Sequence, residues 1–276
     1  MVDVIVFSKD RPWQLSEYIR TFQKYCLGDF QMYVIYKASK PEFDTAYQHL
    51  IKANETVEFV REDESMDFNT CLNMIVNEYG EAPYIMFGVD DVIFYREFSL
   101  FAAELALSYN YTFSYSFRLN PNITYCQPAN MKNHIPPLSD HSKFDYYFDR
   151  SKGTGDWNYP WELSASVLKK SAVRDIITQI HRQSAPVGPA NPNRLEANGS
   201  VVVSQMTSSL TNFAQKLPVC STITVNRVQE EYKNPVINEQ KADNLLQYYW
   251  DKKQYDDEAY SKLELNSIHI GEFLIK

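Results

Sequence analysis

The first third of the chain alternates between short apolar runs and longer segments in which apolar residues repeat every three or four positions. Short runs rich in β-branched and aromatic residues predict buried strands, and the longer repeat predicts amphipathic helices. This alternation, with short loops, predicts an α/β fold with a mostly parallel, Rossmann-like sheet. The predicted strands are 2–7, 31–36, 57–60 and 84–87, and the predicted helices are 11–27, 41–53 and 67–79.

The first predicted helix has recognisable start and stop signals. Asp10 is expected to cap it, with Arg11 and Pro12 in its first turn, and Gly28 is expected to end it. Its apolar face is expected to consist of Leu15, Ile19, Phe22 and Cys26.

The pattern changes after about Asn120. Residues 119–159 are rich in Asn, Pro, Ser, Asp and Tyr without a long periodic run, which indicates a functional loop or lid. No internal repeat occurs. We therefore expect one domain with a regular half, about 1–118, and a less regular half, about 119–276. In the second half we predict helices at 168–182, 203–215 and 241–255, a strand at 221–225 and a turn-rich break at 186–192.

Composition excludes several classes of protein. A net charge of −8 argues against a nucleic-acid-binding protein, although it leaves room for a local basic pocket. No apolar run is long enough to predict a membrane span, and the first residues do not resemble a signal peptide. The four cysteines include no Cys-X-X-Cys pair, so we expect reduced thiols in a cytoplasmic protein. The sequence does not indicate an oligomeric state.

Two adjacent carboxylates, Asp90 and Asp91, follow the fourth predicted strand in the segment YIMFGVDDVIF (84–94). Ligands of open α/β sheets bind at the carboxyl ends of the strands. Two carboxylates there predict a site for Mg²⁺ or Mn²⁺ that serves a phosphate group. The structural alternative is a loop start with solvated side chains.

The motifs that are missing narrow the chemistry. The chain has only eight glycines and contains neither a G-X-X-X-X-G-K-[ST] loop nor a G-X-G-X-X-G turn after the first strand. A metal held by carboxylates is then the remaining way to neutralise a diphosphate. Sugar transfer from a nucleoside diphosphate fits, because a divalent ion offsets the charge of the leaving group. An inverting transferase also needs a base for the acceptor hydroxyl.

Several segments in order along the chain resemble small GT-A fold glycosyltransferases of bacterial or viral type. Their Asp-X-Asp signature appears here in an X-Asp-Asp form, Val89-Asp90-Asp91. The resemblance implies a nucleotide-sugar donor, most simply a UDP-sugar, a glycan acceptor, and Mn²⁺ or Mg²⁺ as cofactor. The matching segments are FSKDRPWQL (7–15), VIYKAS (34–39), MFGVDDVIF (86–94), YSFRLNPNI (115–123), GDWNYPWEL (155–163), PNRLE (192–196), VNRVQ (225–229) and NSIHI (266–270).

The resemblance also implies residue roles on the donor side. Asp90 is expected at the ribose or sugar, and Asp91 and His269 are expected at the metal or diphosphate. Five further donor contacts are expected at the ends of the first two strands: Phe7, Ser8, Arg11, Tyr36 and Lys37. Each of these roles has a structural alternative. Arg11 could simply lie in the first helical turn, Lys37 could be a solvated surface residue, and His269 could be a half-buried residue of a strand.

On the acceptor side, the resemblance implies Asp156 as the catalytic base, with Trp157 and Trp161 beside the acceptor. The family pattern has a further aspartate after Tyr-Pro, where this chain has Trp161-Glu162. Either Glu162 replaces that aspartate or the catalytic base is a residue other than the one assigned. These residues also have structural alternatives. Asp156 could belong to a turn, Glu162 could form a salt bridge, and the two tryptophans could pack together in the core. Glu196 is interpreted as part of a salt-bridged helix start.

We therefore predict a metal-dependent glycosyltransferase. One alternative is a sugar nucleotidyltransferase, which needs a loop rich in glycine and in lysine or arginine after the first strand, where this chain has only Ser8-Lys9-Asp10-Arg11-Pro12. Another is a non-catalytic sugar-binding module on the same fold. An aspartyl-phosphate phosphatase needs an aspartate at the end of the first strand, where this chain has Phe7.

Overall fold

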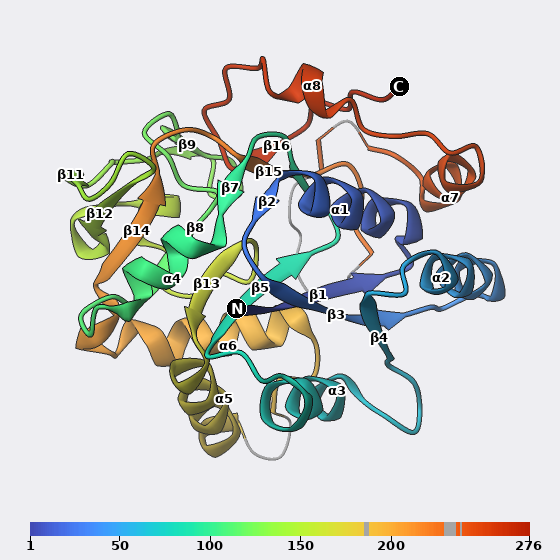
Figure 1. Cartoon of the computed structure of the whole chain (residues 1–276), viewed down its shortest axis with the longest axis horizontal. Coiled ribbons are helices and arrows are strands. Elements are labelled where there is room, and N and C mark those ends of the chain that lie inside the picture. Colours follow the sequence, from blue (N-terminus) through green and yellow to red (C-terminus); the bar gives the residue numbers. More distant parts are fainter. Residues whose placement is uncertain (185–187, 229–235, 238) are drawn as a thin grey trace.

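The structure is a computed structural model of the chain that describes residues 1–184, 188–228, 236–237 and 239–276 (Figure 1). A nine-stranded mixed sheet in the order β11-β12-β14-β8-β13-β5-β1-β3-β4 runs through the molecule. Both predicted halves contribute strands to it. These are β1 (Val2–Lys9), β3 (Phe30–Lys37), β4 (Val57–Arg61), β5 (Tyr84–Val89), β8 (Ser114–Ser116), β11 (Ser139–Asp140), β12 (Asp145–Asp149), β13 (Ser166–Lys169) and β14 (Thr211–Gln215).

The first half has the predicted alternation of strands and helices. β5, β1, β3 and β4 are parallel, and they are connected through α1 (Pro12–Tyr25), α2 (Pro41–Ala53), and α3 (Phe68–Met74) with its π-helical continuation η1 (Ile75–Tyr79). Beyond β5 the sheet becomes mixed, because β13 pairs antiparallel with both β5 and β8. The carboxyl ends of β1, β3 and β5 therefore lie at one edge, as an open parallel sheet requires.

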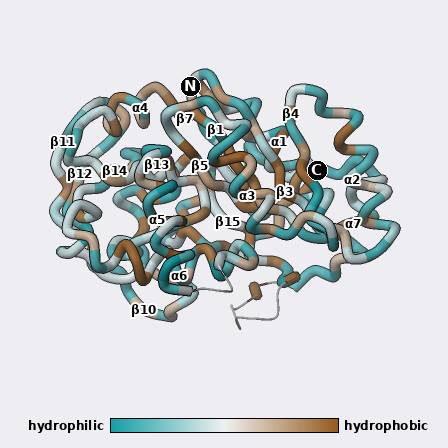
Figure 2. The backbone as a smooth tube through the Cα atoms, turned by 90° about the horizontal axis from the view of Figure 1, so that it is seen from below, coloured by the Kyte–Doolittle hydropathy of each residue, from teal (hydrophilic) through white to brown (hydrophobic). Residues whose placement is uncertain are grey.

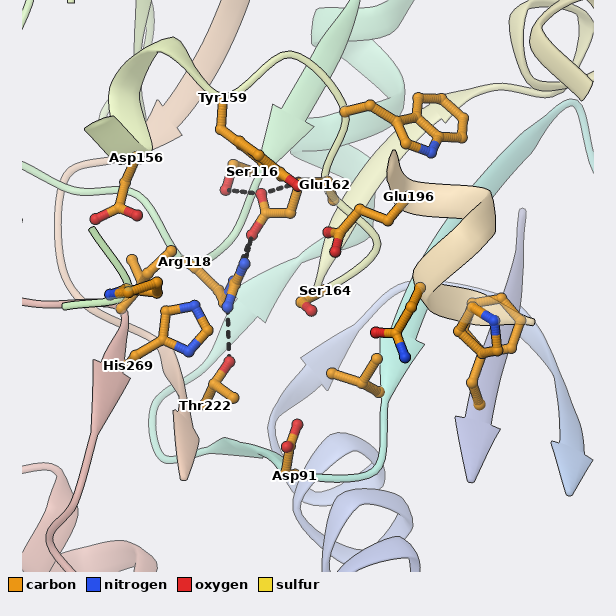
Figure 3. Close-up of a pocket in the computed structure, with 18 of the residues that line it drawn as sticks. Asp91, Ser116, Arg118, Asp156, Tyr159, Glu162, Ser164, Glu196, Thr222 and His269 are labelled. Carbon is orange, nitrogen blue, oxygen red and sulfur yellow. Dashed lines mark hydrogen bonds and ion pairs between the residues drawn. The ribbon is translucent and has the colours of Figure 1, made fainter. Parts of the chain in front are cut away.

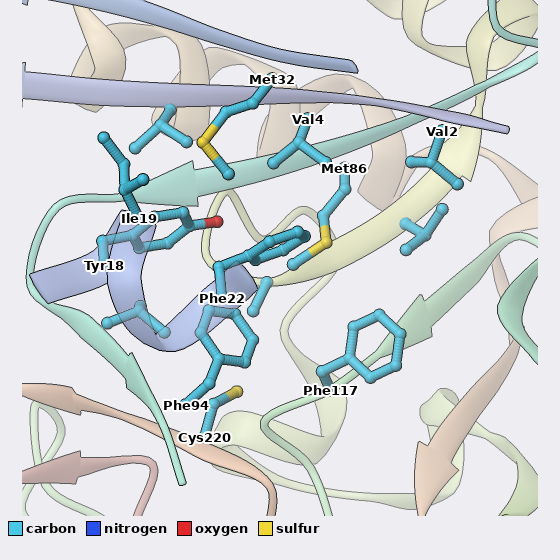
Figure 4. Packing of buried hydrophobic residues seen from close by; sticks show 14 of the residues in the cluster. Val2, Val4, Tyr18, Ile19, Phe22, Met32, Met86, Phe94, Phe117 and Cys220 are labelled. Atoms are coloured by element: carbon cyan, nitrogen blue, oxygen red, sulfur yellow. The ribbon is translucent and has the colours of Figure 1, made fainter. Parts of the chain in front are cut away.

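Alternating side chains of the strands build two cores. On β1, Val4 and Val6 point to one face, and Ile5 and Phe7 point to the other. The first face packs on α1, α2 and α4 (Leu100–Ser108), as Figure 4 shows for part of it. The second packs on α3, α5 (Lys170–Ser184) and α6 (Pro192–Ser204). Figure 2 shows α4 and α6 on opposite sides of the strands.

The start of α1 differs from the prediction. Asp10 does not cap it, because its backbone is left-handed (φ +54°) and its carboxylate accepts a hydrogen bond from the Ser39 backbone N–H at 2.6 Å. Arg11 occupies the N-cap position, and Pro12 is the first helical residue. The helix ends at Tyr25, before Cys26, which pairs in β2 (Cys26–Leu27) with β7 (Phe98–Ser99).

Two predictions in the second half were wrong. The segment predicted as a helix over 203–215 instead contains the end of α6, a short turn η4 (Thr207–Ser209) and strand β14. Leu168, assigned to a helix, lies in β13, and α5 begins at Lys170. Helix α4 was not predicted, because its sequence LFAAELALS is apolar on nearly every face. The predicted break at 186–192 lies partly outside the described residues.

The segment 119–159 contains only short elements, in keeping with its irregular composition. They include β9 (Tyr125–Cys126), β10 (Met131–Lys132), and the 3₁₀ turns η2 (Arg150–Lys152) and η3 (Gly155–Asn158).

A second, three-stranded sheet has the order β16-β15-β6. Its strands are β6 (Val92–Phe94), β15 (Cys220–Ile223) and β16 (His269–Ile270). The C-terminal segment also contains helices α7 (Ala242–Trp250) and α8 (Asp257–Tyr260). The first of them, α7, lies within the helix predicted at 241–255. Trp13 of α1 packs into the core formed here, which joins the C-terminal segment to the first helix. Among the described residues, no helix has the length and apolar character needed to cross a bilayer.

Candidate functional site

A cavity of about 870 Å³ opens at the carboxyl ends of β1, β3 and β5. The first half of the chain contributes Ser8, Lys37 and Asp91 to its lining, and the second half contributes residues such as Asp156 and Glu162. Figure 3 shows Asp91 of the first half and Asp156 and Glu162 of the second half around one space. The cavity therefore has the place in the fold that the sequence predicted for a ligand site.

Arg11 holds both predicted donor-side aspartates. Its Nη1 atom donates to Asp90 Oδ1 at 2.9 Å and to Asp91 Oδ2 at 3.1 Å, and Nη2 donates to the Asn226 carbonyl at 2.6 Å. Asp90 is 3% exposed and Asp91 is 15% exposed, so Asp91 is the more accessible of the two. The guanidinium is thus engaged inside the protein, although Arg11 also lines the cavity. Its expected contact with the donor stays a prediction.

The two carboxylates retain one unused oxygen each. Asp90 Oδ2 and Asp91 Oδ1 are buried and have no hydrogen-bond partner in the described structure. Burial raises the pKa of Asp90, and the charge of Arg11 opposes part of that rise. Two orphaned carboxylate oxygens at a cavity wall fit a divalent cation, which prefers oxygen ligands. In the described residues, however, no group of three or more His, Cys, Asp or Glu side chains forms a complete metal cluster.

The other predicted donor residues divide according to the face of the strand on which they lie. Phe7, Ser8 and Lys37 line the cavity, although Ser8 is hydrogen-bonded to the Tyr47 hydroxyl and Lys37 is paired with Glu62. Tyr36 was wrongly placed there. It points to the opposite face of β3, where it belongs to the core beside α1 and α2, because neighbouring residues of a strand alternate between faces.

His269 lies on β16 and lines the same cavity. Its strand is separated from β6 by β15, since Thr222 is in register with both His269 and Val92. Its Nδ1 atom lies 3.5 Å from Thr224 Oγ1. Burial, together with the positive charge of Arg118, lowers the pKa of His269 to about 3. The imidazole is therefore neutral near pH 7 and able to act as a ligand or hydrogen-bond partner.

Glu162 is held in a network on the far wall of the cavity. It forms an ion pair with Arg118 and accepts hydrogen bonds from Ser116 Oγ at 3.1 Å and Ser166 Oγ at 2.5 Å. Arg118 also donates to Thr222 Oγ1 at 2.6 Å. The network links β8, β13 and β15 and corresponds to the ion-paired alternative considered for Glu162.

Asp156 lies on the turn η3 and lines the cavity. Asn133 Nδ2 donates to its Oδ2 at 3.0 Å, and the Asp156 backbone N–H donates to Asn133 Oδ1 at 3.1 Å. Burial raises the pKa of Asp156. The neighbouring Trp157 and Trp161 are each 1% exposed, so both rings serve mainly as packing and not as open sugar platforms.

Glu196 is a site residue that the sequence reasoning missed. It lies in α6, lines the cavity, and accepts a hydrogen bond from the Leu163 backbone N–H at 3.3 Å. Burial raises its pKa to about 7. Within the part of the chain that the structure describes, Glu196 forms no ion pair of its own, and the interpretation of this segment as a salt-bridged helix start stays a prediction. The one sequence signal that could have identified Glu196 is its position in the segment PNRLE (192–196).

One curated protein resembles this chain over nearly its whole length. No family model matches the chain. The chain is 33% identical, over 309 aligned positions, to the bifunctional glycosyltransferase pgtA of Dictyostelium discoideum. The match covers 99% of this chain and 39% of that protein, so the chain spans about two fifths of its relative's length.

Solved structures show weaker likeness. S. aureus TarS is 12% identical, with a TM-score of 0.47, and covers 78% of this chain and 34% of its own. The mannosyltransferase PcManGT of Pyrobaculum calidifontis, solved with GDP-Man and Mn²⁺, is 12% identical with a TM-score of 0.46 and covers 79% of this chain and 57% of its own. Likeness at this level carries no argument about the chemistry of the present cavity.

Proposed function

We propose that the chain is a GT-A type glycosyltransferase that moves a sugar from a nucleoside diphosphate, UDP in the first instance, to a glycan hydroxyl with inversion. The observation that carries the proposal is the meeting, in one cavity, of the Asp90–Asp91 pair with three further carboxylates from the second half of the chain. The similarity to part of a bifunctional glycosyltransferase supports it.

The donor is proposed to bind against the first half, about 1–118. Asp90 and Asp91 would hold Mn²⁺ or Mg²⁺ through their unpartnered oxygens, with neutral His269 turned toward the same ion or the diphosphate. When bound, the metal supplies positive charge for the departing diphosphate. Phe7 and Ser8 would border the nucleotide, and Lys37 adds a partly exposed cation at the cavity edge.

The acceptor is proposed to bind against the second half, about 119–276. Its hydroxyl must lose a proton as it attacks the anomeric carbon, so a carboxylate has to lie within hydrogen-bond reach of it. Asp156, Glu162 and Glu196 all line this part of the cavity. The Arg118–Glu162 pair would also offer hydrogen-bonding groups to sugar hydroxyls without adding net charge.

Release of nucleoside diphosphate from a panel of UDP- and GDP-hexoses tests the proposal. The wild-type protein with Mn²⁺ is expected to release free UDP or GDP slowly in water and faster with a methyl glycoside acceptor. A sugar-binding module would bind a donor without releasing the diphosphate, and a nucleotidyltransferase would require pyrophosphate or a sugar phosphate instead. Either of those two outcomes would refute the proposal.

A further inference from the structure

We propose that Glu196, and not Asp156 or Glu162, is the base that removes the proton from the acceptor hydroxyl. This assignment rests on the proposed glycosyltransferase function. It follows from how differently the three carboxylates are held in the cavity wall, which the hydrogen bonds and burial of the described residues make plain.

Glu162 is the least suited of the three. Three donors already engage its carboxylate, namely the Arg118 guanidinium and the hydroxyls of Ser116 and Ser166. A general base must contact the acceptor hydroxyl directly, and oxygens already occupied by an ion pair and two hydrogen bonds leave little room for that contact. Glu162 is therefore a fixed counter-ion for Arg118.

Asp156 is held less tightly, but it is also committed. The Asn133 side chain both donates to its carboxylate and accepts from its backbone N–H, which fixes the residue on its short turn. One of its two oxygens is thus already bonded to a neutral donor. This geometry suits a residue that accepts a hydrogen bond from the acceptor sugar and orients it.

Glu196 has the freest carboxylate of the three. Its Oε1 atom accepts one long hydrogen bond, 3.3 Å from the Leu163 backbone N–H. Among the described residues this is the one hydrogen bond that its carboxylate makes, and the residue lines the cavity. The charged or titratable groups that face it are Arg118, Glu162 and Tyr159. The charges of Arg118 and Glu162 largely cancel, so burial dominates and keeps the carboxylate basic.

The fold fixes the position of Glu196 through its helix. Leu195 is fully buried in the core beside α3 and α5. One turn further, Gly199 lies against the Trp161 indole, where a Cβ atom would be 2.5 Å from Nε1. This close approach brings α6 onto the segment 161–163 and places Glu196 beside Leu163. Figure 3 shows Glu196 and Glu162 reaching the same space from these two elements.

The step balances without another reactant. The acceptor oxygen forms a bond to the anomeric carbon as the bond from that carbon to the diphosphate oxygen breaks. The bonding pair leaves with the diphosphate, and the acceptor proton passes to a Glu196 oxygen. Water in place of the sugar acceptor gives donor hydrolysis by the same transfer.

Donor hydrolysis as a function of pH tests the assignment, with UDP-glucose, UDP-galactose, UDP-N-acetylglucosamine and GDP-mannose as probes in the presence of Mn²⁺. Wild-type kcat/KM is expected to fall as pH decreases through about 7, because the base becomes protonated. In Glu196→Gln, kcat/KM is expected to be lower by about 100-fold or more, and its fall with decreasing pH, the acid limb of the profile, is expected to be absent. Glu196→Asp is expected to recover part of the activity with the limb retained.

Two further variants separate a chemical role from a structural one. Asp156→Asn is expected to lower turnover but to keep the acid limb. The exposed Glu55, on a turn far along the chain from the site, provides a matched control as Glu55→Gln. The melting temperature and the donor Kd of Glu196→Gln are expected to match those of the wild type.

Three results would overturn the assignment. Glu196→Gln retaining wild-type kcat/KM within about five-fold, with its acid limb, would leave the base elsewhere while the proposed function stands. If Glu196→Gln binds the donor more weakly, or is less stable, to an extent that accounts for its loss of activity, the residue has a structural role. A wild-type protein that neither binds nor hydrolyses any of the four donors would refute the proposed function and the assignment with it.

Discussion

Arg11 Nη1 lies 3.1 Å from Asp91 Oδ2, so a cation of the protein itself already contacts the carboxylate expected to anchor a metal. Arg11 is the N-cap of α1, and Asp91 follows β5. The ion pair therefore fixes the start of the first helix to the end of the central strand. A divalent ion at this edge has to share the carboxylates with Arg11 and bind through their remaining oxygens.

Replacing Arg11 tests this sharing. Arg11→Met leaves Asp90 and Asp91 buried without their partner, which is expected to lower the free energy of unfolding by about 3–5 kcal/mol in urea titrations without metal. Mn²⁺ alone is expected to raise the melting temperature of Arg11→Met more than that of the wild type, because the ion then replaces the lost positive charge. The exposed Arg182→Met serves as the control. Equal Mn²⁺ shifts in the variant and the wild type would show that no cation binds between these carboxylates.

Glu162 is expected to matter for stability. Glu162→Gln keeps an oxygen that can accept from Ser116 and Ser166 but leaves the Arg118 guanidinium, which is 4% exposed, without a counter-ion. Breaking such a buried pair is expected to destabilise the fold by about 3 kcal/mol in urea unfolding. Glu55→Gln again provides a matched control. An unfolding free energy equal to the wild-type value would contradict the structural role assigned to the Arg118–Glu162 pair.

Gly199→Ala is expected to destabilise the protein, although a glycine-to-alanine substitution usually stabilises a helix. At an open helical position, Gly→Ala gains up to about 1 kcal/mol. Here the added Cβ would meet Trp161 Nε1 at 2.5 Å, so the buried indole or the helix must move. Gly199→Ala is therefore expected to lose about 1–3 kcal/mol in chemical denaturation. Val201→Ala, at an exposed position of the same helix, controls for helix propensity; a gain in stability for Gly199→Ala would show that α6 has room to shift.

Asp257 connects α8 to the first helix and gives a pH-dependent test. It is fully buried and pairs with Arg20 and Lys24 of α1. Burial alone raises the pKa of Asp257, but hydrogen bonds from Lys24 and Tyr25 and the charge of Arg20 outweigh it, so the folded-state pKa lies below the usual range. Because the folded pKa is depressed, its stabilising effect is present above the unfolded pKa of about 4 and is lost as pH falls toward the folded value.

Asp257→Asn is accordingly expected to cost about 3 kcal/mol at pH 7, since it leaves partly exposed basic groups around a neutral side chain. The difference from the wild type is expected to shrink below about pH 4 in urea titrations repeated at several pH values. A difference that stays constant from pH 7 to pH 3 would mean that the ionised carboxylate is not what stabilises this contact.

The first half of the fold could be predicted because its local signals agree with its tertiary structure. The apolar run before Asp90 is continuous, and Pro41 starts α2 as its position in the sequence indicates. Short loops then allow only a parallel arrangement of consecutive strands. The second half could not be predicted in this way, because β8 and β14 are far apart in sequence and pair only in the sheet. A pattern that depends on distant partners leaves little trace in any one segment.

The site was predictable where a residue ends a strand and not where its role depends on a distant contact. Asp91 was expected at the ligand-binding edge because it follows β5, and the structure places it in the cavity wall. Tyr36 was misplaced because the two faces of β3 cannot be told apart from its apolar residues alone. Glu196 was missed because the burial that raises its pKa and its contact with Leu163, 33 residues away in sequence, both depend on the folded structure. That contact exists only once α6 packs against Trp161.

Calorimetry of UDP binding with and without Mn²⁺, in the wild type and in Asp91→Ala, tests the central claim most directly. The wild type is expected to bind UDP at least about ten-fold more tightly with Mn²⁺ than with a chelator, a difference of about 1.4 kcal/mol. Asp91→Ala is expected to bind UDP with the same weak affinity under both conditions. Asp91→Ala that keeps the full Mn²⁺-dependent gain would contradict the claim that this carboxylate anchors the cation beside the leaving diphosphate.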